Sequence, residues 1–143
     1  PRMASLIFGS ADYISDLGCR PGEDRMELLY ALQVIVTSAR AAGIDAVDAP
    51  CFDIHNMELL RAEALQARRL GFAGKSALHP EQLALINHAF DVTAEEIEWA
   101  QKTIAELDAA EGRGKALTTV NGKLLDNPHR AAAERILRRG KED

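Results

Sequence analysis

The first 90 residues of the chain alternate short apolar runs with helical patterns three times. The run at 4–9 (ASLIFG) is almost wholly apolar and ends in glycine, which is typical of a strand buried on both faces. Similar runs at 44–54 and 72–80 are each followed by a helical pattern. Strand–helix units repeated at intervals of roughly 30 residues favour right-handed crossovers and a parallel sheet. The sequence therefore predicts an α/β fold.

The predicted helices carry their own boundary signals. In residues 25–42 the apolar positions recur at helical spacing: Met26, Leu29, Tyr30, Val34, Thr37 and Ala41. The signals at the helix ends are, in chain order, Gly43 after this first helix, Asn56 and Gly71 around the second, and Pro80 in the first turn of the third. Residues 10–24, between the first strand and the first helix, are expected to form a loop.

The pattern changes after Phe90. Thr93 is expected to cap a long helix, with Glu96 at the capping-box position. Two short strands then surround Asn121-Gly122, a dipeptide that favours a hairpin turn, and a last helix follows over 129–139. Hairpins and isolated helices do not continue a strand–helix cycle. We therefore divide the chain into residues 1–90 and an extension, residues 91–143.

Composition argues against several classes of function. At a net charge of −5, with lysines and arginines spread among the acids, no continuous basic surface is expected, so nucleic acid is a poor partner. No apolar run approaches the roughly 20 residues that span a bilayer, and no leader is recognisable, so we expect no membrane partner and a cytoplasmic location. Cys19 and Cys51 lack CxxC spacing and are expected to stay reduced.

In parallel α/β folds, function gathers at the carboxyl ends of the strands. Asp12 follows the first strand and a glycine, so it could ligate a divalent cation such as Mg²⁺, which prefers hard oxygen ligands. It could equally cap the turn after the strand. His79 before Pro80 could act as a general acid or base or be a turn element. Lys75 could reach a phosphate or carboxylate or form an ion pair.

Four blocks of the sequence, in order, carry a resemblance to a known family: FGSADY, GFAGKSALHPEQLALIN, TAEEIEWAQ and VNGKLLDNPHRAAA. They resemble the HpcH/HpaI aldolase and citrate lyase family, in particular the branch of the citrate lyase beta subunit and of stand-alone malyl-CoA and citramalyl-CoA lyases. The resemblance extends over almost the whole chain.

This resemblance implies a (β/α)8 TIM barrel that cleaves or forms a carbon–carbon bond in a thioester of CoA or of an acyl carrier, with Mg²⁺ holding the oxo- or hydroxy-acid half. The three units would be strands six to eight, followed by the family's C-terminal tail. A whole barrel needs roughly 250 residues, so we expect an intact polypeptide about twice as long. The start at Pro1, directly before an apolar run, also suggests a piece of a longer chain.

The resemblance also implies roles for individual residues. Asp12 matches an aspartate that ligates Mg²⁺ beside a glutamate from an earlier strand. The backbone of Ser10, Ala11 and Asp12 matches the turn that receives the substrate carboxylate. Asp126 matches a tail aspartate that exchanges a proton with the acyl carbon in a neighbouring subunit, which implies a homotrimer or hexamer. A last set would line the pocket: Asp48, Ala49 and Pro50.

Two other functions stay open. One is a metal-dependent aldolase that acts on free hydroxy-oxo-acids without CoA, although the hairpin and Asp126 would not be expected in those shorter enzymes. The other is a barrel subunit or binding module without turnover, because three strand–helix units cannot close a barrel. One departure from the family pattern is His55-Asn56, which stands where an acidic residue is common and which we interpret as structural.

Overall fold

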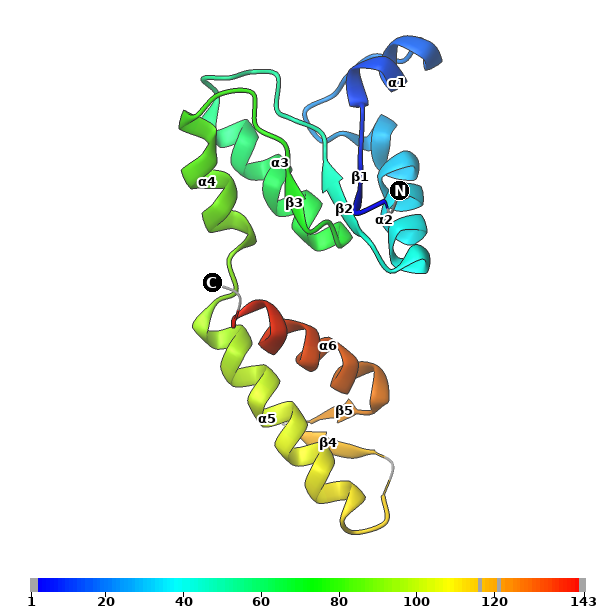
Figure 1. Cartoon of the computed structure of the whole chain (residues 1–143), viewed down its shortest axis with the longest axis vertical. Coiled ribbons are helices and arrows are strands. Elements are labelled where there is room, and N and C mark those ends of the chain that lie inside the picture. The colour runs from blue at the N-terminus through cyan, green and yellow to red at the C-terminus, as the bar shows by residue number, and fades with distance from the viewer. Residues whose placement is uncertain (1–2, 116, 121, 142–143) are drawn as a thin grey trace. The chain divides into compact units, whose positions relative to one another are not determined.

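The computed structural model describes residues 3–115, 117–120 and 122–141, which form two compact units divided between Phe90 and Asp91 (Figure 1). In the first unit the elements are, in chain order, β1 (Ser5–Ile7), α1 (Ser10–Leu17), η1 (Met26–Leu28), α2 (Leu29–Ala42), β2 (Asp45–Asp48), α3 (Met57–Leu70), β3 (Gly74–Lys75) and α4 (Glu81–Phe90).

The three strands pair in the order β1-β2-β3, and both pairings are parallel. Ile7 lies opposite Val47, and Val47 lies opposite Gly74. The crossovers contain α2 and α3, as the strand–helix repeat predicts. The predicted parallel sheet is thus confirmed.

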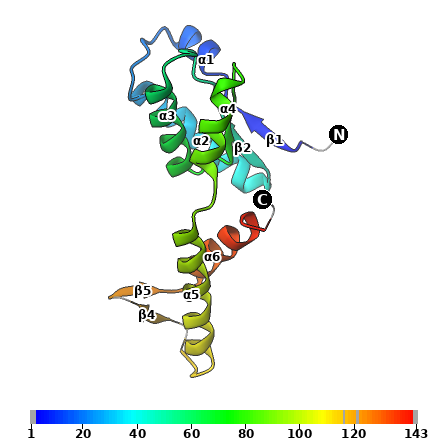
Figure 2. The ribbon, with the colours of Figure 1, turned by 90° about the vertical axis from the view of Figure 1, so that its left-hand side faces the viewer.

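The helices α2 and α3 cover one face of this sheet (Figure 2). Leu6 and its register partner Ala46 pack into the core on that side. The next residue along β1, Ile7, points to the other face because side chains alternate along a strand, and it is 65% exposed. Within the described residues, a parallel strand therefore presents an apolar side chain to solvent, although parallel sheets are normally covered on both faces.

Helix boundaries follow the predicted signals closely. Asn56 Oδ1 accepts a hydrogen bond from the Leu59 backbone N–H at 3.0 Å, so Asn56 is the N-cap of α3. Gly43 and Gly71 both adopt left-handed backbone conformations at the ends of α2 and α3, with φ of 67° and 101°. A side chain there would be strained, which explains glycine at these two ends.

The predicted loop at residues 10–24 is wrong over its first half, because residues 10–17 form the helix α1. Tyr13 and Ile14 pack against the core, and the Tyr13 ring lies edge-on to Phe8 with centroids 5.5 Å apart. Gly18 ends the helix in the left-handed conformation. These contacts stabilise a helix too short for its sequence pattern to be distinctive.

The buried face of α2 also differs from the predicted one. Met26 is 61% and Tyr30 79% exposed, although both belong to the apolar spacing used for the prediction. The buried side chains of α2 are instead Ala31, Leu32, Val36 and Ala39. Apolar residues occur on more than one side of this helix, so spacing alone does not identify the face that packs.

The second unit consists of α5 (Ala94–Glu111), β4 (Thr118–Val120), β5 (Lys123–Leu125) and α6 (Asn127–Arg139). The predicted capping box is present, with Glu96 N–H donating to Thr93 Oγ1 at 3.2 Å and Thr93 N–H donating to Glu96 Oε2 at 2.9 Å. The two strands pair antiparallel as predicted, but Asn121 of the expected turn lies outside the described residues.

Helices α5 and α6 of the second unit pack together, and Arg130 Nη1 donates to Asp108 Oδ1 at 2.7 Å between them.

In the part of the chain that the structure describes, no helix is both long and apolar enough to span a membrane.

A buried ionic network holds the carboxyl ends of β2 and β3 together. Asp48 is fully buried at the end of β2, and Arg25 donates to both of its carboxylate oxygens at 2.6 and 3.0 Å. Lys75 Nζ donates to Asp48 Oδ2 at 2.9 Å and to the Ala49 carbonyl at 2.7 Å, and it lies 2.7 Å from Glu63 Oε2. Two positive and two negative side chains thus neutralise one another in this network.

Arg25, which belongs to this network, has an unusual backbone conformation. Its φ of 58° is the one positive φ among the described non-glycine residues. A left-handed conformation costs roughly 1–2 kcal/mol for such a residue. The bidentate, charge-assisted pair with Asp48 offsets that cost.

We expect Lys75→Met to lower the free energy of unfolding by about 3–5 kcal/mol, because Glu63 loses its buried cation and Asp48 keeps only Arg25. Urea unfolding of the protein measures the change. Lys123→Met, at an exposed position of β5, is the control and should change the value by less than about 0.5 kcal/mol. Equal, small effects of the two substitutions would contradict a stabilising role for the network.

Candidate active site at the carboxyl ends of the strands

The carboxyl ends of β1, β2 and β3 lie at one edge of the sheet because the strands are parallel. In β1 the strand ends at Ile7, and α1 begins only three residues later, at Ser10. The predicted residues Ser10, Ala11 and Asp12 therefore form the first turn of a helix, rather than the predicted loop, at this edge. This is the edge at which parallel α/β folds place their ligands.

The first turn of α1 is suited to bind an anion. Tyr13 N–H donates to Gly9 O at 3.1 Å, so it is the first N–H with an acceptor inside the helix. The preceding N–H groups of the turn point out of the helix end, where the helix dipole is positive. Ser10 is buried, whereas Ala11 and Asp12 are exposed. The backbone here could receive a substrate carboxylate.

Asp12 presents an available carboxylate beside this turn. Among the described residues its side chain has no hydrogen bond or ion pair, and Oδ2 lies 3.7 Å from the position a Cβ would take on Gly9. A glycine before the helix thus leaves space next to the carboxylate. No group of three or more His, Cys, Asp or Glu side chains that could hold a metal occurs in the described residues.

This donor set fits one kind of metal centre. Mg²⁺ is usually held by one or two carboxylates together with waters and substrate oxygens. Asp12 fits the part of a single carboxylate ligand of such an ion. The set does not fit zinc, which takes three or four protein ligands of the His and Cys type.

Asp48 is placed differently from a pocket-lining acid. Its carboxylate is fully buried and occupied by Arg25 and Lys75, so it is not free to meet a ligand. Ala49 is buried with its carbonyl bound to Lys75, and Pro50 is half-buried. Of the two alternatives for Lys75, the ion pair is therefore the one observed.

His79 has the contacts of a turn residue. Its Nδ1 accepts a hydrogen bond from the Glu81 backbone N–H at 3.3 Å, at the start of α4. Its ring centroid lies 6.4 Å from that of His55, at an angle of 61°. These contacts favour the structural interpretation of His79 over a catalytic one.

Sequence reasoning missed a buried glutamine that joins two loops of this edge. Gln82 Nε2 donates to Cys51 O at 3.2 Å, and Gln82 Oε1 accepts from Leu78 N–H at 2.9 Å. The glutamine lies on the buried face of α4 with Ile86 and Ala89. The sequence signal that could have indicated its burial is a polar residue among the apolar positions of one helix face.

Both cysteines are free thiols, as expected from their spacing. Burial is the main cause that raises the pKa of the Cys51 thiol, and the nearby Glu63 carboxylate raises it further. Cys51 is therefore protonated and unreactive at neutral pH.

Asp126 lies in the second unit, directly before α6. Its Oδ1 is 2.6 Å from Nδ1 of His129, and the Arg130 backbone N–H donates to its carbonyl at 3.2 Å. The side chains of Asp126 and His129 are 45% and 44% exposed. Asp126 thus forms the N-terminal boundary of the last helix, as expected, while keeping access to solvent.

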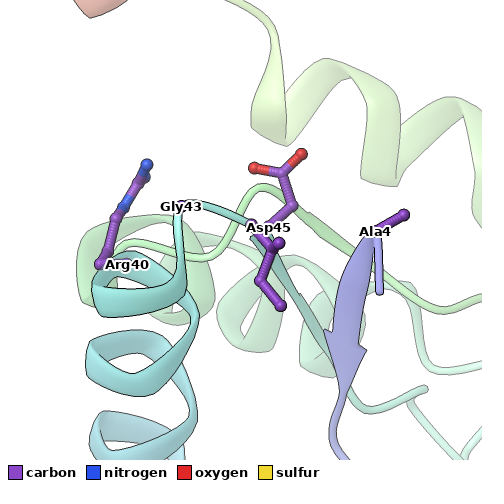
Figure 3. Close-up of a pocket in the computed structure, with 5 residues that line it drawn as sticks. Ala4, Arg40, Gly43 and Asp45 are labelled. Carbon is purple, nitrogen blue, oxygen red and sulfur yellow. The ribbon is translucent and has the colours of Figure 1, made fainter. Parts of the chain in front are cut away.

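A shallow pocket of about 240 Å³ lies at the opposite end of the strands (Figure 3). It is lined by Ala4, Arg40, Gly43, Ile44 and Asp45, which surround the amino ends of β1 and β2. Parallel α/β folds place their ligands at the other end, where the carboxyl ends of the strands lie. The pocket is therefore not the candidate site.

Known proteins are similar to this chain in sequence and in structure. The chain is 36% identical over 137 residues to a (3S)-malyl-CoA thioesterase of Cereibacter sphaeroides, covering 96% of this chain and 48% of that protein. It is 32% identical over 133 residues to the mitochondrial citramalyl-CoA lyase of Mus musculus, covering 93% of this chain and 39% of the relative. The chain thus spans less than half the length of these relatives.

A solved structure of CitE from Mycobacterium tuberculosis, in complex with magnesium, acetoacetate and coenzyme A, superimposes with a TM-score of 0.76 at 28% identity. The superposition covers 94% of this chain and 51% of that one. The family model described as HpcH/HpaI aldolase/citrate lyase matches residues 1–80, which contain all three parallel strands and Asp12. The chain belongs to the HpcH/HpaI aldolase/citrate lyase family.

Proposed function

We propose that the whole protein is a (β/α)8 TIM barrel in which residues 1–90 supply strands six to eight and residues 91–143 form a C-terminal extension. The uncovered face of the sheet supports this proposal, because Ile7 is an exposed apolar residue on a parallel strand. In a closed barrel that face would form the packed interior. The open edges of β1 and β3 would pair with further strands in the same way.

For the whole protein we propose a Mg²⁺-dependent carbon–carbon lyase that interconverts a 3-hydroxyacyl-CoA of the citryl, malyl or citramalyl type with an acyl-CoA and an oxo-acid. The observation that carries this proposal is the position of Asp12 in the first turn of the helix that follows β1. The names of the relatives support the substrate class, since they include a citramalyl-CoA lyase and a malyl-CoA thioesterase. A cytoplasmic location stays a prediction.

The residues of α1 have two proposed roles. The backbone N–H groups of Ser10, Ala11 and Asp12 bind and orient the substrate carboxylate, and the Asp12 carboxylate holds the metal. When bound, Mg²⁺ lowers the energy of the alkoxide and polarises the carbonyl of the oxo-acid half. After the end of β2, half-buried Pro50 lines the proposed substrate pocket, and the buried Ala49 supports it through the ionic network around Asp48.

Asp126 has the proposed role of transferring a proton to or from the acyl carbon. Cleavage leaves enolate charge on the thioester half, so an acid must protonate the departing carbon, and in the synthetic direction the same group removes that proton. Asp126 is half exposed and lies in the extension, which supports a site completed by a neighbouring subunit in a homotrimer or hexamer. The extension would also exclude water when it closes over the substrate.

Substitution of each aspartate distinguishes their proposed roles. We expect Asp12→Asn to abolish Mg²⁺-dependent turnover and Mg²⁺ binding, because a neutral amide replaces the charged ligand. Asp126→Asn should bind Mg²⁺ normally but slow proton exchange at the acyl carbon by roughly 10²–10⁴-fold, because the acid–base group is lost. Asparagine also caps a helix well, so α6 is retained.

Calorimetric Mg²⁺ titration and exchange of the acyl protons with D₂O provide the two measurements. Equal loss of metal binding in both variants would contradict the assigned roles. So would normal metal binding by Asp12→Asn.

The second prediction concerns the substrate. We expect the protein to bind a CoA thioester in the presence of Mg²⁺ and to release an oxo-acid together with an acyl-CoA. A CoA-independent aldolase would instead cleave free hydroxy-oxo-acids and ignore the thioester, and a thioesterase would release free CoA. Chromatography of the products from malyl-CoA and citramalyl-CoA distinguishes the three. Failure to bind any CoA thioester would exclude the preferred function and favour the aldolase or a non-catalytic subunit.

A further inference from the structure

We propose that His129 is a positioning residue for Asp126, whose carboxylate it holds by the hydrogen bond between Nδ1 and Oδ1 in the orientation needed for proton exchange. The inference rests on the proposed function of Asp126. His129 has no role in the function proposed above, and its role here follows from the geometry at the start of α6.

The side chains of His129 and Asp126 are in direct contact. His129 Nδ1 lies 2.6 Å from Asp126 Oδ1, slightly shorter than the range of about 2.7–2.9 Å for charge-assisted hydrogen bonds between nitrogen and oxygen. At this distance a proton must lie between the two atoms, because a nitrogen lone pair facing a carboxylate lone pair would be repulsive. The proton belongs either to the imidazole, which then donates to the carboxylate, or to the carboxylic acid, which then donates to the imidazole. In both cases Oδ1 has one fixed partner.

Histidine is an unusual residue type at this position of a capping box. His129 is the third residue of α6, where a capping box usually has Glu or Gln to accept a hydrogen bond from the N-cap N–H. The Asp126 N–H lies 3.3 Å from the same Nδ1. An Nδ1 that carries a proton has no lone pair for this N–H, so the two contacts compete, and the carboxylate contact is 0.7 Å shorter. The start of α6 thus has a capping box and, in addition, the shorter contact between the two side chains.

The neighbouring arginine in the sequence is engaged elsewhere. Arg130, the residue after His129 on α6, is paired with Asp108 and Glu111 of α5, at 2.7 and 3.3 Å. Among the described residues, the side chain that contacts the Asp126 carboxylate is that of His129. Both groups are nearly half exposed, so a bound substrate can reach the carboxylate while the imidazole holds it.

A capping role alone would use the same atoms, so the test must separate capping from positioning. His129→Ala removes both, whereas His129→Gln restores a cap acceptor and an amide donor. Thr93→Ala is the matched control, since it breaks the capping box of α5 without touching Asp126. Loss of a cap costs roughly 0.5–2 kcal/mol in either helix. All three variants are made in the full-length protein, and their melting temperatures are compared.

The functional readout is exchange of the methyl protons of acetyl-CoA with D₂O. We expect His129→Ala to slow exchange by about tenfold or more, a part of the contribution of a well-oriented acid–base group. His129→Gln should recover most of the rate, and Thr93→Ala should leave it unchanged at a similar loss of melting temperature. Exchange in His129→Ala as fast as in Thr93→Ala would overturn the proposal, as would failure of glutamine to restore it.

A second readout does not depend on turnover. ¹⁵N NMR of the His129 ring should show a hydrogen-bonded Nδ1 whose shift changes in Asp126→Asn, and an unaffected ring would overturn the proposal. Failure of the proposed function would appear differently, as normal proton exchange in Asp126→Asn with the ring contact still visible by NMR.

Discussion

The carboxylate of Asp48 is the charge around which the first unit is organised. It lies fully buried at the end of β2 and is neutralised by Arg25 and Lys75, while Glu63 balances the second of these cations. An uncompensated charge at this depth would cost several kcal/mol, so the four side chains must be in place together. They come from the segment before η1, from β2, from α3 and from β3, and they tie these elements to one another.

This network explains how a small sheet can present a defined edge. The Lys75 ammonium also binds the carbonyl of Ala49, and Gln82 binds the carbonyl of Cys51, so the chain after β2 is held on both sides. Neither contact involves Asp12, which stays exposed at the neighbouring strand end. The carboxylate of Asp48 is thus paired with cations and stabilises the fold, whereas the carboxylate of Asp12 is exposed where a ligand is proposed to bind.

The sequence predicted the strand–helix order, the cap residues and the capping box, because each depends on local spacing or on a single residue type. It did not predict α1, which depends on packing of Tyr13 and Ile14, or the buried face of α2, where apolar residues occur on several sides. Asp12 was indicated by its place after the first strand and then by the family resemblance, and Asp126 was indicated as an acid–base group by the resemblance alone. Both roles stay predictions. The ion pairs of Arg25 and Glu63 could not be predicted from the sequence, because their partners are at least 12 residues away along the chain.

The central claim is that the edge beside β1 is one side of a magnesium-dependent lyase site. A crystal structure of the full-length protein with Mg²⁺ and a CoA thioester tests this claim most directly. The account predicts a magnesium ion bound to the Asp12 carboxylate, with the substrate carboxylate on the N–H groups of α1. Magnesium and substrate bound elsewhere, with Asp12 facing bulk solvent, would contradict it.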